Sequence, residues 1–199
     1  MKKKIIILIV NLLILIAPIF AQNITLWNGI HTGMTEEQAT QRLRAIAGND
    51  TIRIWRDTAV SSVSSTTPMV LLNTSVRELN YSFSQGLVKI RAFIQSPSYT
   101  RLEYIGNINL TFFNGRIITV AVSWSASAIT RNQMLIQQFG QPKFNSANKQ
   151  LPAWESSGMF VVTNDAAVFT EIIFIDINGF RNAVNDDTRK KQQSSGIQF

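Results

Sequence analysis

Residues 28–48 read NGIHTGMTEEQATQRLRAIAG, and they carry the clearest helix signal of the chain. Thr35 and Gln38 have the spacing of a capping box, in which the threonine hydroxyl accepts the Gln38 amide N–H and the glutamine side chain reaches back. The apolar residues fall on one helical face: Ala39, Leu43, Ile46 and Ala47. Gly48 then supplies a left-handed stop. The stretch therefore predicts a helix that begins after Thr35, ends at Gly48 and covers a sheet.

The chain that follows this helix alternates apolar and polar residues, which predicts β-strands. A short strand is expected at residues 51–56. Residues 79–94 predict a hairpin around Gln85-Gly86, in which Phe83 pairs with Val88. The apolar residues of the strand before this turn and those of the strand after it would then lie on the same face of the sheet.

Residues 102–124 predict a longer hairpin at the centre of the sheet. With a two-residue turn at Asn114-Gly115, the apolar residues of its two strands would lie on opposite faces. A three-residue loop at 113–115 pairs Leu110 with Ile118 and keeps the apolar residues together. The pattern therefore predicts the longer loop, with Gly115 left-handed at a bulge.

A second helix is predicted at residues 127–139, because Gly140 and Pro142 follow it as stop signals. Residues 159–163 and 168–177 predict two more strands, and the second of these is apolar on both faces. Such a strand is either central or covered by a helix. The sequence thus predicts an α+β fold, an antiparallel sheet with two helices packed on one face.

The expected organisation is a leader at residues 1–21, one α+β domain at residues 22–180 and a polar loose tail at residues 181–199. A further hypothesis is a tandem duplication with halves at residues 22–124 and 125–180. It rests on a repeated order, in which a helix ending at glycine precedes a strand with tryptophan: Gly48 with Trp55, and Gly140 with Trp154.

The leader has the three parts of a bacterial secretory signal peptide. Lys2, Lys3 and Lys4 precede an apolar run, and Ala21 offers a small residue at the cleavage position. Cleavage would make Gln22 the mature N-terminus. The alternative is an uncleaved anchor, although the run is shorter than the roughly 20 residues of a spanning helix. We expect a periplasmic or extracellular protein, and the sequence does not say which envelope compartment it reaches.

The composition limits the chemistry of the chain. It has no cysteine, which excludes thiol nucleophiles, disulfides and a lipid-accepting cysteine. The formal net charge is +7, and without the three leader lysines it is about +4. This diffuse charge is consistent with weak contact with an anionic membrane surface and does not indicate nucleic-acid binding.

No catalytic or metal-binding set is visible in the sequence. His31 is the only histidine, and it lies in the glycine-rich lead-in to the first helix, whereas a triad or a zinc site needs several partners. Glu171 and Asp176, in the last apolar strand, are the acids to compare with the paired carboxylates of a glycosidase. We assign no catalytic residue, no metal and no cofactor.

Two segments carry a family resemblance. Residues 135–142, LIQQFGQP, followed by Trp154 and two strands, resemble a helix-plus-hairpin unit of related secreted proteins. Residues 29–43, GIHTGMTEEQATQRL, resemble the start of small bacterial envelope domains. These are outer-membrane assembly lipoproteins of the SmpA/OmlA type and the β-lactamase-inhibitor-protein-like group. The resemblance implies helices on one face of an antiparallel sheet and a role in binding or assembling other proteins. Unlike the lipoproteins, this chain has no cysteine before the domain.

Trp55 is the residue we assign to an interface, because it alternates with Ile52 and Ile54 and exposed tryptophans anchor protein interfaces. The leading hypothesis is an exported, non-enzymatic module that binds another, unidentified protein of the cell envelope. The alternatives are a carboxylate-based hydrolase and a small outer-membrane β-barrel, the latter suggested by the terminal Ile197-Gln198-Phe199.

Overall fold

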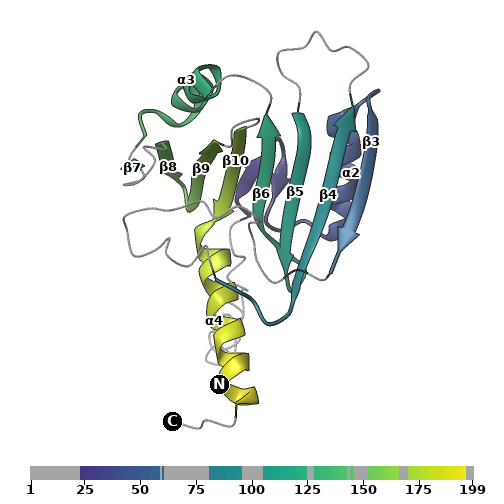
Figure 1. Ribbon diagram of the computed structural model, residues 1–199, viewed down its shortest axis with the longest axis vertical. Coiled ribbons are helices and arrows are strands. Elements are labelled where there is room, and N and C mark those ends of the chain that lie inside the picture. Colours follow the sequence, from purple (N-terminus) through teal and green to yellow (C-terminus); the bar gives the residue numbers. More distant parts are fainter. Residues whose placement is uncertain are drawn as a thin grey trace, which may run out of the picture.

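The computed structural model describes residues 23–58, 60, 81–95, 105–124, 128–142, 144–145, 152–165 and 170–195 (Figure 1). The predicted leader and its cleavage position at Ala21 and Gln22 lie outside these residues, as do the first residues of both predicted hairpins. Within the described part of the chain, no helix combines the length and hydrophobicity needed to cross a bilayer.

An antiparallel sheet of eight strands forms the centre of the fold, which confirms the predicted α+β class. Its strands, in spatial order, are β3 (Thr51–Asp57), β4 (Leu87–Gln95), β5 (Ile105–Phe113), β6 (Arg116–Trp124), β10 (Thr170–Asp176), β9 (Met159–Asp165), β8 (Pro152–Ser156) and β7 (Phe144–Asn145). A separate pair, β1 (Thr25–Trp27) and β2 (Ile30–His31), precedes them. The described helices are α2 (Glu36–Ala47), α3 (Ala128–Phe139) and α4 (Ile177–Ser194).

The topology consists of two similar series. Helix α2 is followed by β3 to β6, and helix α3 is followed by β7 to β10, each series forming a meander of four neighbouring strands. The two meanders meet where β6 pairs with β10. The boundary between them falls between Trp124 and Ala128, where the two predicted halves meet. The duplication itself stays a prediction.

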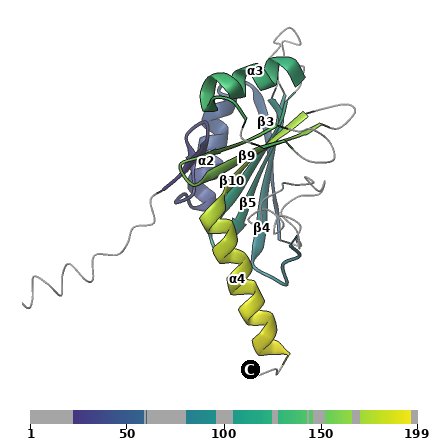
Figure 2. The same cartoon turned by 90° about the vertical axis from the view of Figure 1, so that its left-hand side faces the viewer.

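Side chains on the two faces of the sheet belong to two separate cores. The first core contains Ala39, Leu43 and Ala47 of α2, Leu135 of α3, and alternate residues of the strands such as Leu110, Val120 and Phe174. The second core contains the intervening residues, such as Phe160 and Ile173, together with Phe180, Ala183 and Val184 of α4. Figure 2 shows α2 beside the sheet and α4 running away from it. Strand β10 is buried on both faces because β1 packs against one face and α4 against the other, which explains its continuous apolar sequence.

The predicted start and end of the first helix are confirmed. The Gln38 amide donates to the Thr35 hydroxyl at 3.2 Å, and the Thr35 amide donates to the Gln38 side chain at 2.9 Å. Helix α2 ends at Gly48, whose φ of 59° lies in the left-handed region. The helix contacts β3 and β4 through its buried face.

The predicted loop of the long hairpin is wrong. The turn has two residues, Asn114 and Gly115, with φ of 48° and 77°, so that Phe113 faces Arg116. The extra residue lies in the strand, because Phe112 faces Ile117 and the register shifts before Thr111 faces Thr119. The intervening residue, Ile118, is buried in the second core. The prediction assumed one buried face, whereas two cores accept both Ile117 and Ile118.

The predicted hairpin around Gln85-Gly86 is also wrong. Strand β4 pairs with β3 on one side and β5 on the other, with Ala92 between Ile54 and Ile108. Both hydrogen-bonding edges of β4 are therefore occupied from Lys89 to Phe93, and Val88 faces Phe112 instead of Phe83. Phe83 instead packs in the second core against Phe113 and Phe180, with ring centroids 5.3 Å and 6.0 Å apart.

The predicted loose tail at residues 181–199 is corrected by helix α4, which runs from Ile177 to Ser194. Asp176 caps it by accepting the Gly179 amide at 2.9 Å. The buried positions recur at helical spacing: Phe180, Ala183, Val184 and Asp187. The sequence pattern conceals this helix because a buried aspartate stands where an apolar residue is expected, and because most of the remaining face is polar.

Candidate interaction face

Trp55 lies on an exposed part of the sheet. Strand β3 is an edge strand, and its side chains alternate, so Ile52 and Ile54 pack against the first core while Arg53 and Trp55 face the opposite side. The Trp55 side chain is 50% exposed, which is unusual for tryptophan, the largest of the amino-acid side chains. The predicted orientation of Trp55, opposite to Ile52 and Ile54, is thus what the structure shows.

The register of three strands places further side chains beside Trp55. Across the sheet, Trp55 faces Arg91 and then Asn109, while Arg53 faces Phe93 and then Asn107. We call these six residues the open face. Arginine and aromatic side chains alternate on it both along and across the strands, because each arginine lies opposite an aromatic residue. All six are exposed or half-buried.

The open face is bounded on one side by buried residues. In the next row across the sheet, Lys89 and Thr111 are buried. Burial lowers the pKa of the Lys89 ammonium, and the charge of Arg91 lowers it further, whereas Glu171 and Asp57 act in the opposite direction. On this side, the exposed surface therefore ends at the row that contains Trp55.

The two arginines of the open face differ in their partners. Arg91 donates to the Asp57 carboxylate at 3.1 Å, and both side chains are partly exposed. Among the described residues Arg53 has no hydrogen-bond or ion-pair partner. The face thus combines one unpaired guanidinium, one paired guanidinium, two aromatic rings and two amides. This set can bind carboxylates by charge-assisted hydrogen bonds and apolar groups by contact with the rings.

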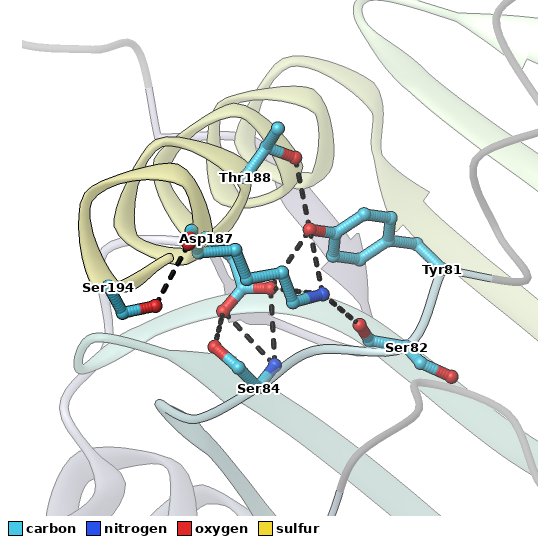
Figure 3. A network of polar contacts seen from close by, with 7 residues as sticks. Tyr81, Ser82, Ser84, Asp187, Thr188 and Ser194 are labelled. Carbon is cyan, nitrogen blue, oxygen red and sulfur yellow. Dashed lines mark hydrogen bonds and ion pairs between the residues drawn. The ribbon is translucent and has the colours of Figure 1, made fainter. Parts of the chain in front are cut away.

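Helix α4 lies on the same side of the sheet, against β6 and β10, and a polar cluster fixes it there (Figure 3). Asp187 is fully buried and accepts hydrogen bonds from the Tyr81 hydroxyl at 2.9 Å and from the Ser84 amide and hydroxyl. Lys191 forms an ion pair with Asp187 at 2.9 Å and donates to the Ser82 carbonyl at 2.6 Å. We call Tyr81, Ser84, Asp187 and Lys191 the Asp187 cluster.

Burial of Asp187 by itself would raise the pKa of this carboxyl group, but the hydrogen bonds from Ser84, Lys191 and Tyr81 together lower that pKa to about 2. The same contacts raise the pKa of Lys191, first through the hydrogen bond with Tyr81 and then through that with Asp187. The ionised pair is therefore the stable form of the cluster at neutral pH. Its side chains fill the contact between α4 and the segment before β4, which is a structural role.

The two acids considered for catalysis are not brought together. Glu171 and Asp176 are separated by five positions in β10, so they point to opposite faces of the sheet. Asp176 is buried, caps α4 and accepts from Arg116 at 3.1 Å. The oxygens of the Asp176 carboxylate therefore have structural partners at the start of helix α4.

His31 lies in β2, half-buried, and its Nδ1 atom has no hydrogen-bond partner among the described residues. No group of three or more potential metal ligands occurs in the described part of the chain.

Sequence reasoning missed most of these residues. The open face requires the pairing of β3 with β4, which was not predicted because residues 88–94 were expected to pair with residues 79–83. The Asp187 cluster requires helix α4. A signal for α4 does exist, since Phe180, Ala183, Val184 and Asp187 have helical spacing after a capping aspartate.

Comparisons of the chain with protein-family models, with curated proteins and with solved structures found no match.

Proposed function

We propose that this protein is an exported, non-enzymatic module that binds another protein of the cell envelope, and that the open face is its docking surface. The observation that carries the proposal is the exposure of Trp55 between arginine side chains on a rigid sheet. Tryptophan and arginine are the residues most enriched at the energetic centres of protein interfaces. A sheet holds them in place before binding, so little side-chain entropy is lost.

The composition of the open face indicates the chemistry of the partner. Arg53 has no partner among the described residues, and the Arg91 guanidinium is only partly engaged by Asp57. A partner that presents carboxylates next to an apolar side chain would pair with the arginines and cover Trp55. The placement of Asp176 in a helix cap and ion pair supports this reading over a carboxylate-based hydrolase.

Alanine in place of Trp55 should weaken docking and leave the fold unchanged. Trp55 is half exposed, so the free energy of unfolding should change by less than about 0.5 kcal/mol. Loss of a central tryptophan should weaken the complex by about 2 kcal/mol, or roughly 30-fold in the dissociation constant. A photoreactive phenylalanine analogue at position 55 should give one discrete protein adduct in envelopes of the source cell. The partner identified in this way can then be titrated against the wild type and against Trp55→Ala.

Met134 provides the matched control, because it is the other large hydrophobic side chain exposed in the described residues, at 40%, and it lies on α3. The same analogue at position 134 should give no such adduct, and Met134→Ala should bind the partner normally. The charge reversal Arg53→Glu should also remove the adduct formed from position 55. Equal adducts from both positions, or unchanged affinity of Trp55→Ala, would contradict the proposal.

Export is the second part of the proposed function. We propose that the leader at residues 1–21 directs the chain across the inner membrane and is removed between Ala21 and Gln22. Mass spectrometry of the protein isolated from the envelope should therefore show Gln22 at the N-terminus. An intact Met1 in the membrane fraction would show an uncleaved anchor instead.

A further inference from the structure

A pocket of about 440 Å³ lies on the other side of the sheet from the open face. It is formed where β1, the end of α3 and the turn between β8 and β9 meet, and six consecutive residues, 23–28, line one of its walls. Its apolar lining residues, among them Trp27 and Phe139, pack against the first core. The volume is within the range of about 300–1,000 Å³ that is typical of small-molecule sites.

The wall formed by residues 23–28 is held in place by specific contacts. The Ile24 amide donates to the Thr32 hydroxyl at 3.2 Å, and the Thr32 amide donates to the Ile24 carbonyl at 3.1 Å. The turn between β8 and β9 approaches closely, because a Cβ atom at Gly158 would lie 3.3 Å from the Ile24 side chain. Gly158 also has a φ of 79°, which favours glycine. Two of the pocket's walls, residues 23–28 and the turn between β8 and β9, are thus fixed in place.

The lining side chains of the pocket share one chemistry. Its polar side chains are three amides and three hydroxyls, and its lining contains no charged residue: Asn23, Asn28, Gln138, Thr25, Ser156 and Ser157. None of these six side chains has a hydrogen-bond partner among the described residues, so their side-chain donors and acceptors are available. Amides and hydroxyls each donate and accept. The half-buried rings of Trp27 and Phe139 add flat apolar surface.

From this lining we infer that the pocket binds a neutral saccharide, a pyranoside unit of a glycan. Each sugar hydroxyl both donates and accepts hydrogen bonds, which matches amide and hydroxyl side chains, and the C–H face of a pyranose is apolar, which matches an aromatic ring. The uncharged lining disfavours phosphates and carboxylates, since these need cationic partners. The site is independent of the protein-docking proposal, because it involves neither the same residues nor the same side of the sheet.

Gln138→Ala should weaken saccharide binding by about fivefold to tenfold, because one amide that bridges sugar hydroxyls is lost. The probes are N,N′-diacetylchitobiose and cellobiose, titrated by calorimetry and followed by saturation-transfer NMR on the purified protein. The comparison of the two probes shows whether the acetamido group contributes. Gln137→Ala is the matched control, since Gln137 is the exposed neighbour on α3 and does not line the pocket.

A second variant keeps the test decisive. Ser156→Trp fills the pocket and should abolish saturation transfer to either disaccharide, while circular dichroism and the melting temperature confirm the fold. Absence of binding of both disaccharides at millimolar concentration would overturn the inference. So would equal weakening by Gln137→Ala and Gln138→Ala, or binding of tetra-alanine in place of the disaccharides, which would identify a peptide site along the edge of β1.

Discussion

Alanine in place of Asp187 should lower the free energy of unfolding by about 3 kcal/mol, corresponding to a melting temperature about 10 °C lower. The substitution removes the buried carboxylate that accepts hydrogen bonds from Ser84 and Tyr81, and it leaves the Lys191 ammonium without its counterion. The carboxylate is fully buried, whereas Tyr81 and Lys191 are half-buried, so the loss comes mainly from the hydrogen bonds that converge on Asp187. Thermal and urea unfolding followed by circular dichroism measure the effect.

Asp186 supplies the control, since it is adjacent in sequence and its carboxylate pairs with Arg189 and Lys190 at the surface. Asp186→Ala should change the free energy of unfolding by no more than about 0.5 kcal/mol. Equal effects of the two substitutions would show that the Asp187 cluster does not fix helix α4.

The effect of Asp187→Ala should depend on pH in a defined direction. The pKa of Asp187 is about 2 in the folded protein, below its ordinary value of 3.8, so the ionised carboxylate stabilises the fold above pH 4. As the pH falls from about 4 toward 2, protonation removes this contribution, and the difference between the wild type and the variant should shrink. A difference that grew on acidification would contradict the assigned cause.

Trp154 should be the most important tryptophan for stability, and its replacement by alanine should cost about 4 kcal/mol of unfolding free energy. Its side chain is 1% exposed and lies in the first core, and its indole N–H donates to the Gly140 carbonyl at 2.8 Å. The residue thus connects β8 to the end of α3. Trp154→Ala leaves a cavity and removes the hydrogen bond to the Gly140 carbonyl, effects that urea unfolding measures.

The conservative variant separates the two causes. Trp154→Phe keeps most of the buried ring and removes the hydrogen bond, so it should cost about 1–2 kcal/mol. Trp55→Ala is the second control, since Trp55 occupies the corresponding place after the first helix but is half exposed. If Trp154→Ala and Trp55→Ala were equally destabilising, the assigned difference in burial would be wrong.

The contrast between Trp55 and Trp154 shows how much of the fold can be predicted from the sequence. The capping box at Thr35 and the stop at Gly48 are local signals, and both were predicted correctly, as was the α+β class. The partner of β4 is a non-local choice, because the same alternating pattern fits a neighbour on either side. The distinct environments of Trp55 and Trp154 depend on that choice and on the packing of α3, which no local spacing reveals.

The second core explains the remaining errors. A sheet buried on one face requires strict alternation, and this assumption produced the three-residue loop expected at the long hairpin. Helix α4 gives Ile118 an apolar environment on the other face, so the bulge becomes favourable. The helix itself was missed because Asp187 occupies a buried position and accepts hydrogen bonds from residues more than 100 positions earlier in the chain. The open face results from the pairing of β3, β4 and β5, so the sequence analysis identified only one of its residues, Trp55.

The junction of β6 with β10 has a consequence for the chain's tolerance of change. It is the one pairing in the eight-stranded sheet that joins strands which are not consecutive among the described elements. The entropic cost of bringing the two meanders together is therefore mainly the cost of closing one loop. This loop runs from the end of β6 to the start of β10 and is closed when the two strands pair. The cost of closing a loop grows only logarithmically with its length, by about 0.6 kcal/mol for each doubling. Lengthening a connection within this loop, such as the one between β7 and β8, should thus alter the sheet little, and this gives the protein a place at which its size can change without rearranging its cores.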